Sequence, residues 1–64
     1  MKTSYIIKGK QWRLIACKAL LKASGIPSTH NFIAGSLTLT CNNLGELMVL
    51  QDACKKLDLK YQQT

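Results

Sequence analysis

The stretch SLTLTCNNLGE, Ser36 to Glu46, decides the fold of this chain. Within it, the apolar residues Leu37, Leu39 and Cys41 alternate with small hydroxyl residues. An alternation with a period of two predicts a strand over 36–41 that has one face buried and the other in water. The stretch therefore places a half-buried strand directly before a helix signal.

The helix signal is Asn43-Leu44-Gly45-Glu46, which resembles a capping box with Asn in the place of Ser or Thr. The Asn43 side chain can accept from the amide of the third helical residue, while Glu46 reaches back to the cap. The apolar residues that follow recur at helical spacing: Leu47, Leu50, Cys54 and Leu57. We therefore expect a second helix to begin at Asn43.

A first helix is expected over 10–24, before the decisive stretch. Its end is marked by Ser24-Gly25-Ile26-Pro27, in which Gly supplies a left-handed C′ residue and Pro follows just beyond. Helical spacing assigns the core stripe to Trp12, Ala16, Ala19, Leu20 and Ala23. Three further apolar residues lie outside that stripe and could cover a partner: Leu14, Ile15 and Leu21.

Three more strands complete the prediction. Residues 3–8 are β-branched and aromatic, and a short strand is expected around Leu59 and Tyr61. Residues 28–33 should form a hairpin with 36–41 that turns at Ala34-Gly35. In that register Ile33 opposes Ser36, Phe32 opposes Leu37 and His30 opposes Leu39.

The element order is thus β-α-β-β-α with a final β. This order predicts an α+β two-layer sandwich with two helices on one face of a mostly antiparallel sheet, in the ferredoxin-like order. The length of 64 residues allows one domain, residues 1–64. With 47% hydrophobic residues, the composition favours a folded chain over a disordered one.

The cysteines and the apolar runs indicate a cytoplasmic protein, in a cell or in an infected host. Cys17, Cys41 and Cys54 are an odd number without close pairs, which disfavours a disulfide framework and favours packing in the core. No apolar run approaches the ~20 residues of a membrane span, and the N-terminal residues do not resemble a secretion signal. We expect no membrane partner.

No catalytic or metal-binding constellation is recognisable. His30 is the only imidazole, and near Cys41 it is better explained as a partly buried residue at a strand edge than as half of a catalytic pair. Together with Cys17 and Cys54 these two residues could supply four zinc ligands, but they are far from the spacing of structural zinc sites. We therefore expect no enzyme, no metal and no cofactor.

The candidate site is the N-terminal part of the first helix with the cations around it. The chain carries nine Lys and Arg against three Asp and Glu, a net charge of +6 that attracts anionic surfaces. Trp12 either packs in the core or anchors an interface, since Trp and Arg are enriched in binding hot spots. The neighbouring cations form either a patch for an anionic partner or a solvated helix face: Lys8, Lys10, Arg13, Lys18 and Lys22.

The other surface to consider is the open face of the sheet. Lysine suits phosphate attraction, whereas reading of bases favours Arg, so we do not expect sequence-specific binding of nucleic acid. The residues expected on that face, Asn31, Thr38 and Thr40, are polar and offer no ring for base stacking, with Tyr5 as the one exception.

Two hypotheses of function follow. The first is a small regulatory or inhibitory protein that binds a larger protein or a protein–nucleic-acid complex through the first helix, similar in size and composition to phage-encoded accessory proteins. The second is a basic module that contacts the phosphates of nucleic acid. Association with further copies of the chain is also left open.

Overall fold

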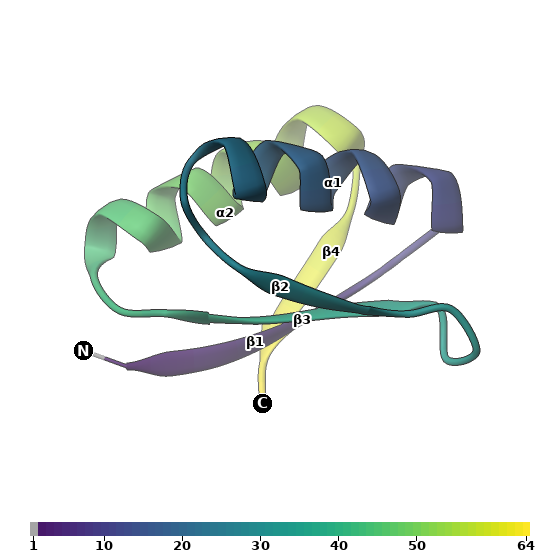
Figure 1. Cartoon of the computed structure of the whole chain (residues 1–64), viewed down its shortest axis with the longest axis horizontal. Coiled ribbons are helices and arrows are strands. Elements are labelled where there is room, and N and C mark those ends of the chain that lie inside the picture. The colour runs from purple at the N-terminus through teal and green to yellow at the C-terminus, as the bar shows by residue number, and fades with distance from the viewer. Residues whose placement is uncertain (1) are drawn as a thin grey trace.

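The computed structural model describes residues 2–64 (Figure 1). Over this range the elements follow the expected order, with the final strand present. The strands are β1 (Thr3–Lys8), β2 (Ser28–Asn31), β3 (Ser36–Cys41) and β4 (Lys60–Gln63). The helices are α1 (Gln11–Ala23) and α2 (Leu44–Leu57).

The four strands form one sheet in the order β2-β3-β1-β4, and each neighbouring pair is antiparallel. Both helices cover the same side of this sheet, and the other side is left open (Figure 1). The predicted two-layer α+β fold with ferredoxin-like order is therefore confirmed. The two central strands, β1 and β3, pair over their full length, from Thr3 with Cys41 to Lys8 with Ser36.

The core lies between the sheet and the helices. Alternate residues of the central strands are buried in it, among them Ile7, Leu37 and Leu39, as their period-two pattern predicts. From the helices come mainly Leu14, Cys17, Leu21, Leu50, Ala53 and Cys54. Burial of these side chains is the main term that stabilises a chain this small.

The predicted core stripe of α1 is wrong. The buried residues are Leu14, Cys17 and Leu21, two of which the spacing placed outside the stripe. The residues expected in the core lie instead on or near the solvent side of the helix: Trp12, Ala16, Ala19, Leu20 and Ala23. Because α1 carries apolar residues on both faces, helical spacing alone could not decide which face meets the sheet.

The end of α1 is confirmed. Gly25 has φ of +81°, the left-handed conformation expected at C′. The Ile26 amide donates to the Leu21 carbonyl at 2.9 Å, and the Gly25 amide donates to the Lys22 carbonyl at 3.0 Å. This pair of bonds is a Schellman motif, and the apolar C″ residue Ile26 is buried in the core.

The predicted register of the hairpin is also wrong. β2 ends at Asn31, which pairs with Ser36, so that His30 opposes Leu37 and not Leu39. The Asn31 side chain accepts from the amides of Ile33 and Ala34, at 3.1 and 3.0 Å. This Asx-type turn ends the strand early and moves Phe32 and Ile33 into the loop. Gly35 closes the turn with φ of +65°.

The start of α2 confirms the cap. The Asn43 Oδ1 atom accepts from the Glu46 amide at 2.9 Å. Glu46 Oε1 in turn accepts from the backbone amide of Asn42 at 2.8 Å, one residue earlier than in the expected reciprocal box. These two bonds fix the turn from Asn42 to Glu46, so that α2 begins shortly after the end of β3.

Candidate interaction surface

Trp12 is exposed. It lies in the first turn of α1 with 61% of its surface in water, so the alternative that it packs in the core is wrong. The guanidinium carbon of Arg13 lies 5.1 Å from the centre of the indole ring, within the range of a cation–π interaction. A large exposed ring held by one neighbour is available for contact with another molecule.

Other exposed apolar residues lie near Trp12. Ile15, one turn later on α1, is 51% exposed. Phe32 and Ile33 are 60% and 101% exposed in the β2–β3 loop, and Gln11 Nε2 donates to the Phe32 carbonyl at 2.7 Å. The loop therefore sits beside the start of α1, at the same end of the molecule (Figure 1). We call Trp12, Ile15, Phe32 and Ile33 the Trp12 surface.

The loop half of this surface is held in place by specific contacts. The His30 and Phe32 rings stack with their centres 4.0 Å apart and an angle of 27° between their planes. The turn at Asn31 and the bond from Gln11 fix the backbone on either side of Phe32. Since ordering on binding costs free energy, a loop already held this way loses less when it meets a partner.

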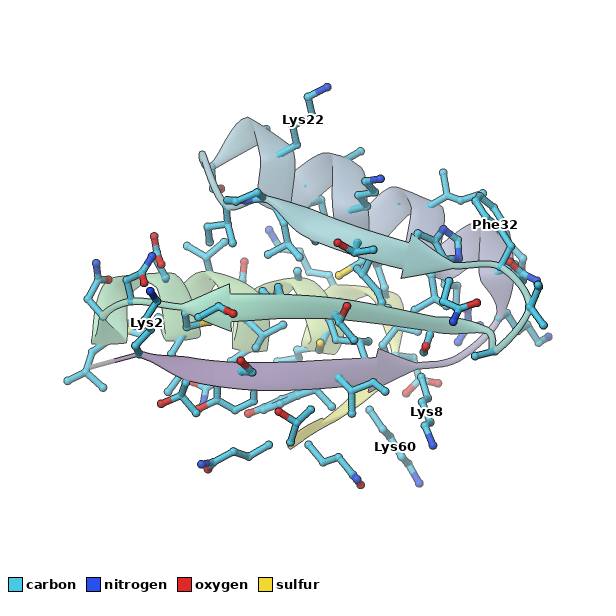
Figure 2. The ribbon with its side chains drawn as sticks, turned by 60° about the horizontal axis from the view of Figure 1, so that its bottom comes forward. Lys2, Lys8, Lys22, Phe32 and Lys60 are labelled. Atoms are coloured by element: carbon cyan, nitrogen blue, oxygen red, sulfur yellow. The ribbon has the colours of Figure 1, made fainter. Side chains whose placement is uncertain are left out.

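The five predicted cations do not form one patch. Lys22 points away from the molecule on one side, whereas Lys8 lies beside Lys60 on the opposite side (Figure 2). Arg13 is engaged with Asp58, with Nη1 to Oδ2 at 3.5 Å. Lys18, one turn before Lys22, is exposed like it on α1. Of the predicted set, Lys10 and Arg13 thus stay closest to Trp12 in the chain, while Lys8 belongs to the sheet.

The sequence did not single out Phe32 and Ile33, because it placed both in the strand 28–33, with Phe32 opposite Leu37 on the buried face. The signal that could have found them is Asn31 itself, whose side chain favours a turn over continued pairing. The helices expose further apolar residues that were expected to be buried or were not considered: Leu20, Leu44 and Met48.

The three thiols are buried in the core, as predicted. The Cys54 thiol donates to the Cys17 sulfur between the two helices, which raises the pKa of Cys54 and lowers that of Cys17. Burial, with a smaller effect of the Glu46 charge, raises the pKa of Cys41. These positions give the thiols a packing role between the layers.

His30 and Cys41 are not brought together. His30 pairs with Leu37, and with a rise of about 3.3 Å per residue Cys41 is about 13 Å further along β3. His30 Nε2 is buried and makes no hydrogen bond within residues 2–64. Over the same range no three His, Cys, Asp or Glu residues gather as metal ligands.

The open side of the sheet carries no aromatic residue from the described strands. Tyr5, the expected exception, faces the helices and is buried, with its ring 5.9 Å from that of Tyr61 in an edge-to-face pair. Thr38 and Thr40 lie on the open side as predicted, with Thr38 exposed and Thr40 half-buried. Base stacking of the kind that open sheets offer to single strands has no platform here.

Two-layer α+β proteins of this element order carry many unrelated functions, so the fold alone assigns none. Comparisons with protein-family models, with curated proteins and with solved structures gave no match. No helix in residues 2–64 combines the length and apolarity needed to cross a bilayer. A function must therefore be inferred from the chemistry of the surface.

Proposed function

We propose that this chain is a non-enzymatic binding protein that docks on a larger protein through the Trp12 surface. The observation that carries the proposal is the exposure of Trp12 and Phe32 from two elements that the Gln11 bond holds together. Aromatic residues are enriched at the centres of protein interfaces, where they fill pockets of the partner. Two such rings on one end of a small protein supply anchors of that kind.

The charges around the surface support the choice of partner. Lys10 and Arg13 flank Trp12 in the chain, and Arg13 already lies against its ring. Charged residues at the rim of an interface steer encounter and select the partner more than they add affinity. We therefore propose a partner whose docking site combines an apolar pocket with acidic residues around it.

The mode of action we propose is regulatory or inhibitory. A chain of 64 residues can act on a larger protein by covering part of its surface, and this needs no catalytic group of its own. The positions of the thiols and of His30 support this reading. All three thiols are buried, and His30 pairs with Leu37, far along β3 from Cys41. The three free thiols also support a cytoplasmic setting, where thiols stay reduced.

The proposal is tested by affinity capture from extract of the organism that encodes the chain, after nuclease treatment, with quantitative mass spectrometry. Trp12→Ala should lose the captured protein. Met48→Ala is the matched control, because Met48 is an equally exposed apolar residue on the other helix. Equal capture by the wild type and Trp12→Ala, or capture that depends on nucleic acid, would contradict the proposal.

A further inference from the structure

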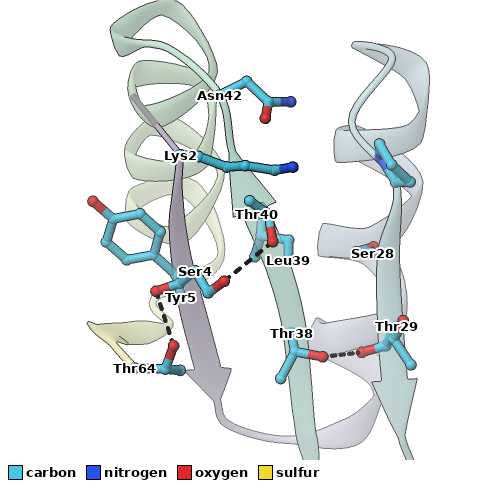
Figure 3. A pocket seen from close by; sticks show the side chains of 11 residues that line it. Lys2, Ser4, Tyr5, Ser28, Thr29, Thr38, Leu39, Thr40, Asn42 and Thr64 are labelled. Carbon is cyan, nitrogen blue, oxygen red and sulfur yellow. Dashed lines mark hydrogen bonds between the residues drawn. The ribbon is translucent and has the colours of Figure 1, made fainter.

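The open side of the sheet is lined by hydroxyl groups and lysines. At the start of β1 it forms an open hollow of about 610 Å³, across which the Lys2 side chain extends (Figure 3). Ser4 and Thr40 share a hydrogen bond of 3.2 Å there, and the hydroxyls of Thr38 and Thr64 donate to backbone carbonyls at 3.4 and 3.2 Å. Tyr5, Pro27 and Leu39 also line the hollow.

Of the three acidic residues, only Asp58 lies at the edge of this surface. Glu46 and Asp52 are on α2, where Glu46 caps the helix and Asp52 pairs with Lys56 at 3.1 Å. Asp58 follows α2, lines a second hollow together with Lys8 and Lys60, and pairs with Arg13 at 3.5 Å. The strands themselves, as far as the structure describes them, carry no carboxylate. The described strands therefore supply no negative charge to balance their lysines.

Two of these lysines lie close enough to repel each other. Lys8 of β1 and Lys60 of β4 are directly opposite in the antiparallel pair, and their side chains lie together (Figure 2). Like charges in this position destabilise a sheet. Asp58 lines the same hollow as both lysines, but among the described residues its carboxylate pairs with Arg13 and with neither lysine. An anion bound between the two ammonium groups would reduce their repulsion.

The lysines also form a line. With a rise of about 3.3 Å per residue, Lys2 and Lys8 stand about 20 Å apart on the same side of the sheet. The hydroxyls of β1 and β3 lie between them. Positive groups at both ends of such a strip match an extended anion with regularly spaced charges, not a single small anion. The hydroxyls add little to this match, because most of them already donate within the sheet.

We propose that the open sheet face, from Lys2 to Lys8 and Lys60, binds the phosphodiester backbone of nucleic acid without reading its sequence. Lysine supplies point charges for phosphates. The described strands contain no Arg and present no aromatic residue on their open side, which removes bidentate base contacts and stacking. A membrane surface fits less well, because the face offers only the half-buried Ile6 for insertion among lipids. This site is separate from the Trp12 surface and does not depend on it.

The test is the binding of a fluorescent 20-base-pair DNA duplex of mixed sequence, followed by anisotropy between 50 and 200 mM salt. Three phosphate contacts predict that the affinity of the wild type falls roughly 40-fold over this range. The triple variant Lys2→Gln/Lys8→Gln/Lys60→Gln should bind at least about tenfold more weakly at 50 mM salt and lose most of the salt dependence.

The matched control is Lys18→Gln/Lys22→Gln/Lys55→Gln, which removes the same charge from exposed helical positions. It should keep the salt dependence of the wild type, and Trp12→Ala should bind DNA normally. Equal losses in the two triple variants would overturn the proposal in favour of diffuse attraction. Absence of DNA binding by the wild type, or tighter binding to vesicles of anionic lipid than to DNA, would also overturn it, and neither result would bear on the Trp12 surface.

Discussion

The Gln11 side chain donates to the Phe32 carbonyl at 2.7 Å and so joins the first turn of α1 to the β2–β3 loop. The two residues are 21 positions apart in the chain, and neither is part of the core. The bond therefore contributes little to global stability. Its effect is to keep Phe32 close to the helix that carries Trp12.

Gln11→Ala should leave the fold intact and loosen the loop. The bond is exposed, so we expect a loss of about 0.5–1.5 kcal/mol at most in the free energy of unfolding. Hydrogen exchange of the amides at Ile33 to Gly35 should become faster, while exchange in β1 stays unchanged. Unchanged exchange in the loop would mean that the Asn31 turn alone holds it.

Trp12→Ala combined with Lys10→Glu should abolish partner binding while the circular dichroism spectrum stays native. The first change removes the exposed ring, and the second reverses a charge that would face an acidic partner. Lys10 is the N-cap position of α1, where a negative charge is favourable to the helix, so unfolding is not expected.

The control for this variant is charge reversal at Lys55 and Lys56 on α2, which changes the net charge more without touching the Trp12 surface. Equal loss of binding in both variants would indicate diffuse electrostatic attraction. Loss of the native spectrum in Trp12→Ala would contradict the exposed position of the ring.

Leu39→Ala should strongly destabilise the protein. Leu39 is buried in the middle of β3, between neighbours on β1 and β2. Removing a buried leucine side chain costs about 2–5 kcal/mol, a large part of the stability of a small domain. Urea unfolding measures this change. A loss below about 0.5 kcal/mol would contradict the burial of this side chain.

Asn43→Ala should weaken the start of α2, because Asn43 Oδ1 accepts from the Glu46 amide. Loss of such a cap costs about 1 kcal/mol. Asn42→Ala is the matched control, since Asn42 takes part through its backbone amide, which alanine retains. Thermal unfolding of the two variants should therefore separate them, with the lower melting temperature for Asn43→Ala.

Lys60→Glu should stabilise the fold. It replaces a pair of like charges across β1 and β4 with a pair of opposite charges, and such exchanges change stability by about 0.2–1 kcal/mol. A higher midpoint of urea unfolding at low salt, with a smaller gain at high salt, is the expected result. A variant of lower stability would show that Lys60 has a structural role.

The parts of the fold that the sequence predicted are those with one dominant local signal. The alternation in β3, the cap at Asn43 and the glycine at position 25 each act within a few residues. The face of α1 had no such signal, since Leu14 and Trp12 both belong to apolar rows on the same helix. Which row is buried is decided by packing against the sheet, which covers the row of Leu14 and leaves the row of Trp12 in water.

In the candidate site, too, the sequence predicted only what depends on local signals. Trp12 was a candidate because a single indole among cations is recognisable from sequence, but its exposure was not predicted, since helical spacing placed it in the core stripe. Phe32 was not, because the sequence favoured a longer strand while the Asn31 side chain ends it. Lys8 and Lys60 are far apart in the chain, and only the pairing of β1 with β4 makes them neighbours.

The place of β1 in the sheet also affects how the protein is made. Of the four strands, β1 is synthesised first, yet its two partners, β3 and β4, follow much later in the chain. During translation one edge of β1 can pair with β3 once that strand has emerged, but its other edge stays unpaired until β4 follows. A ribosome stalled before residue 60 would display β1 as an open edge, available to chaperones or to aggregation.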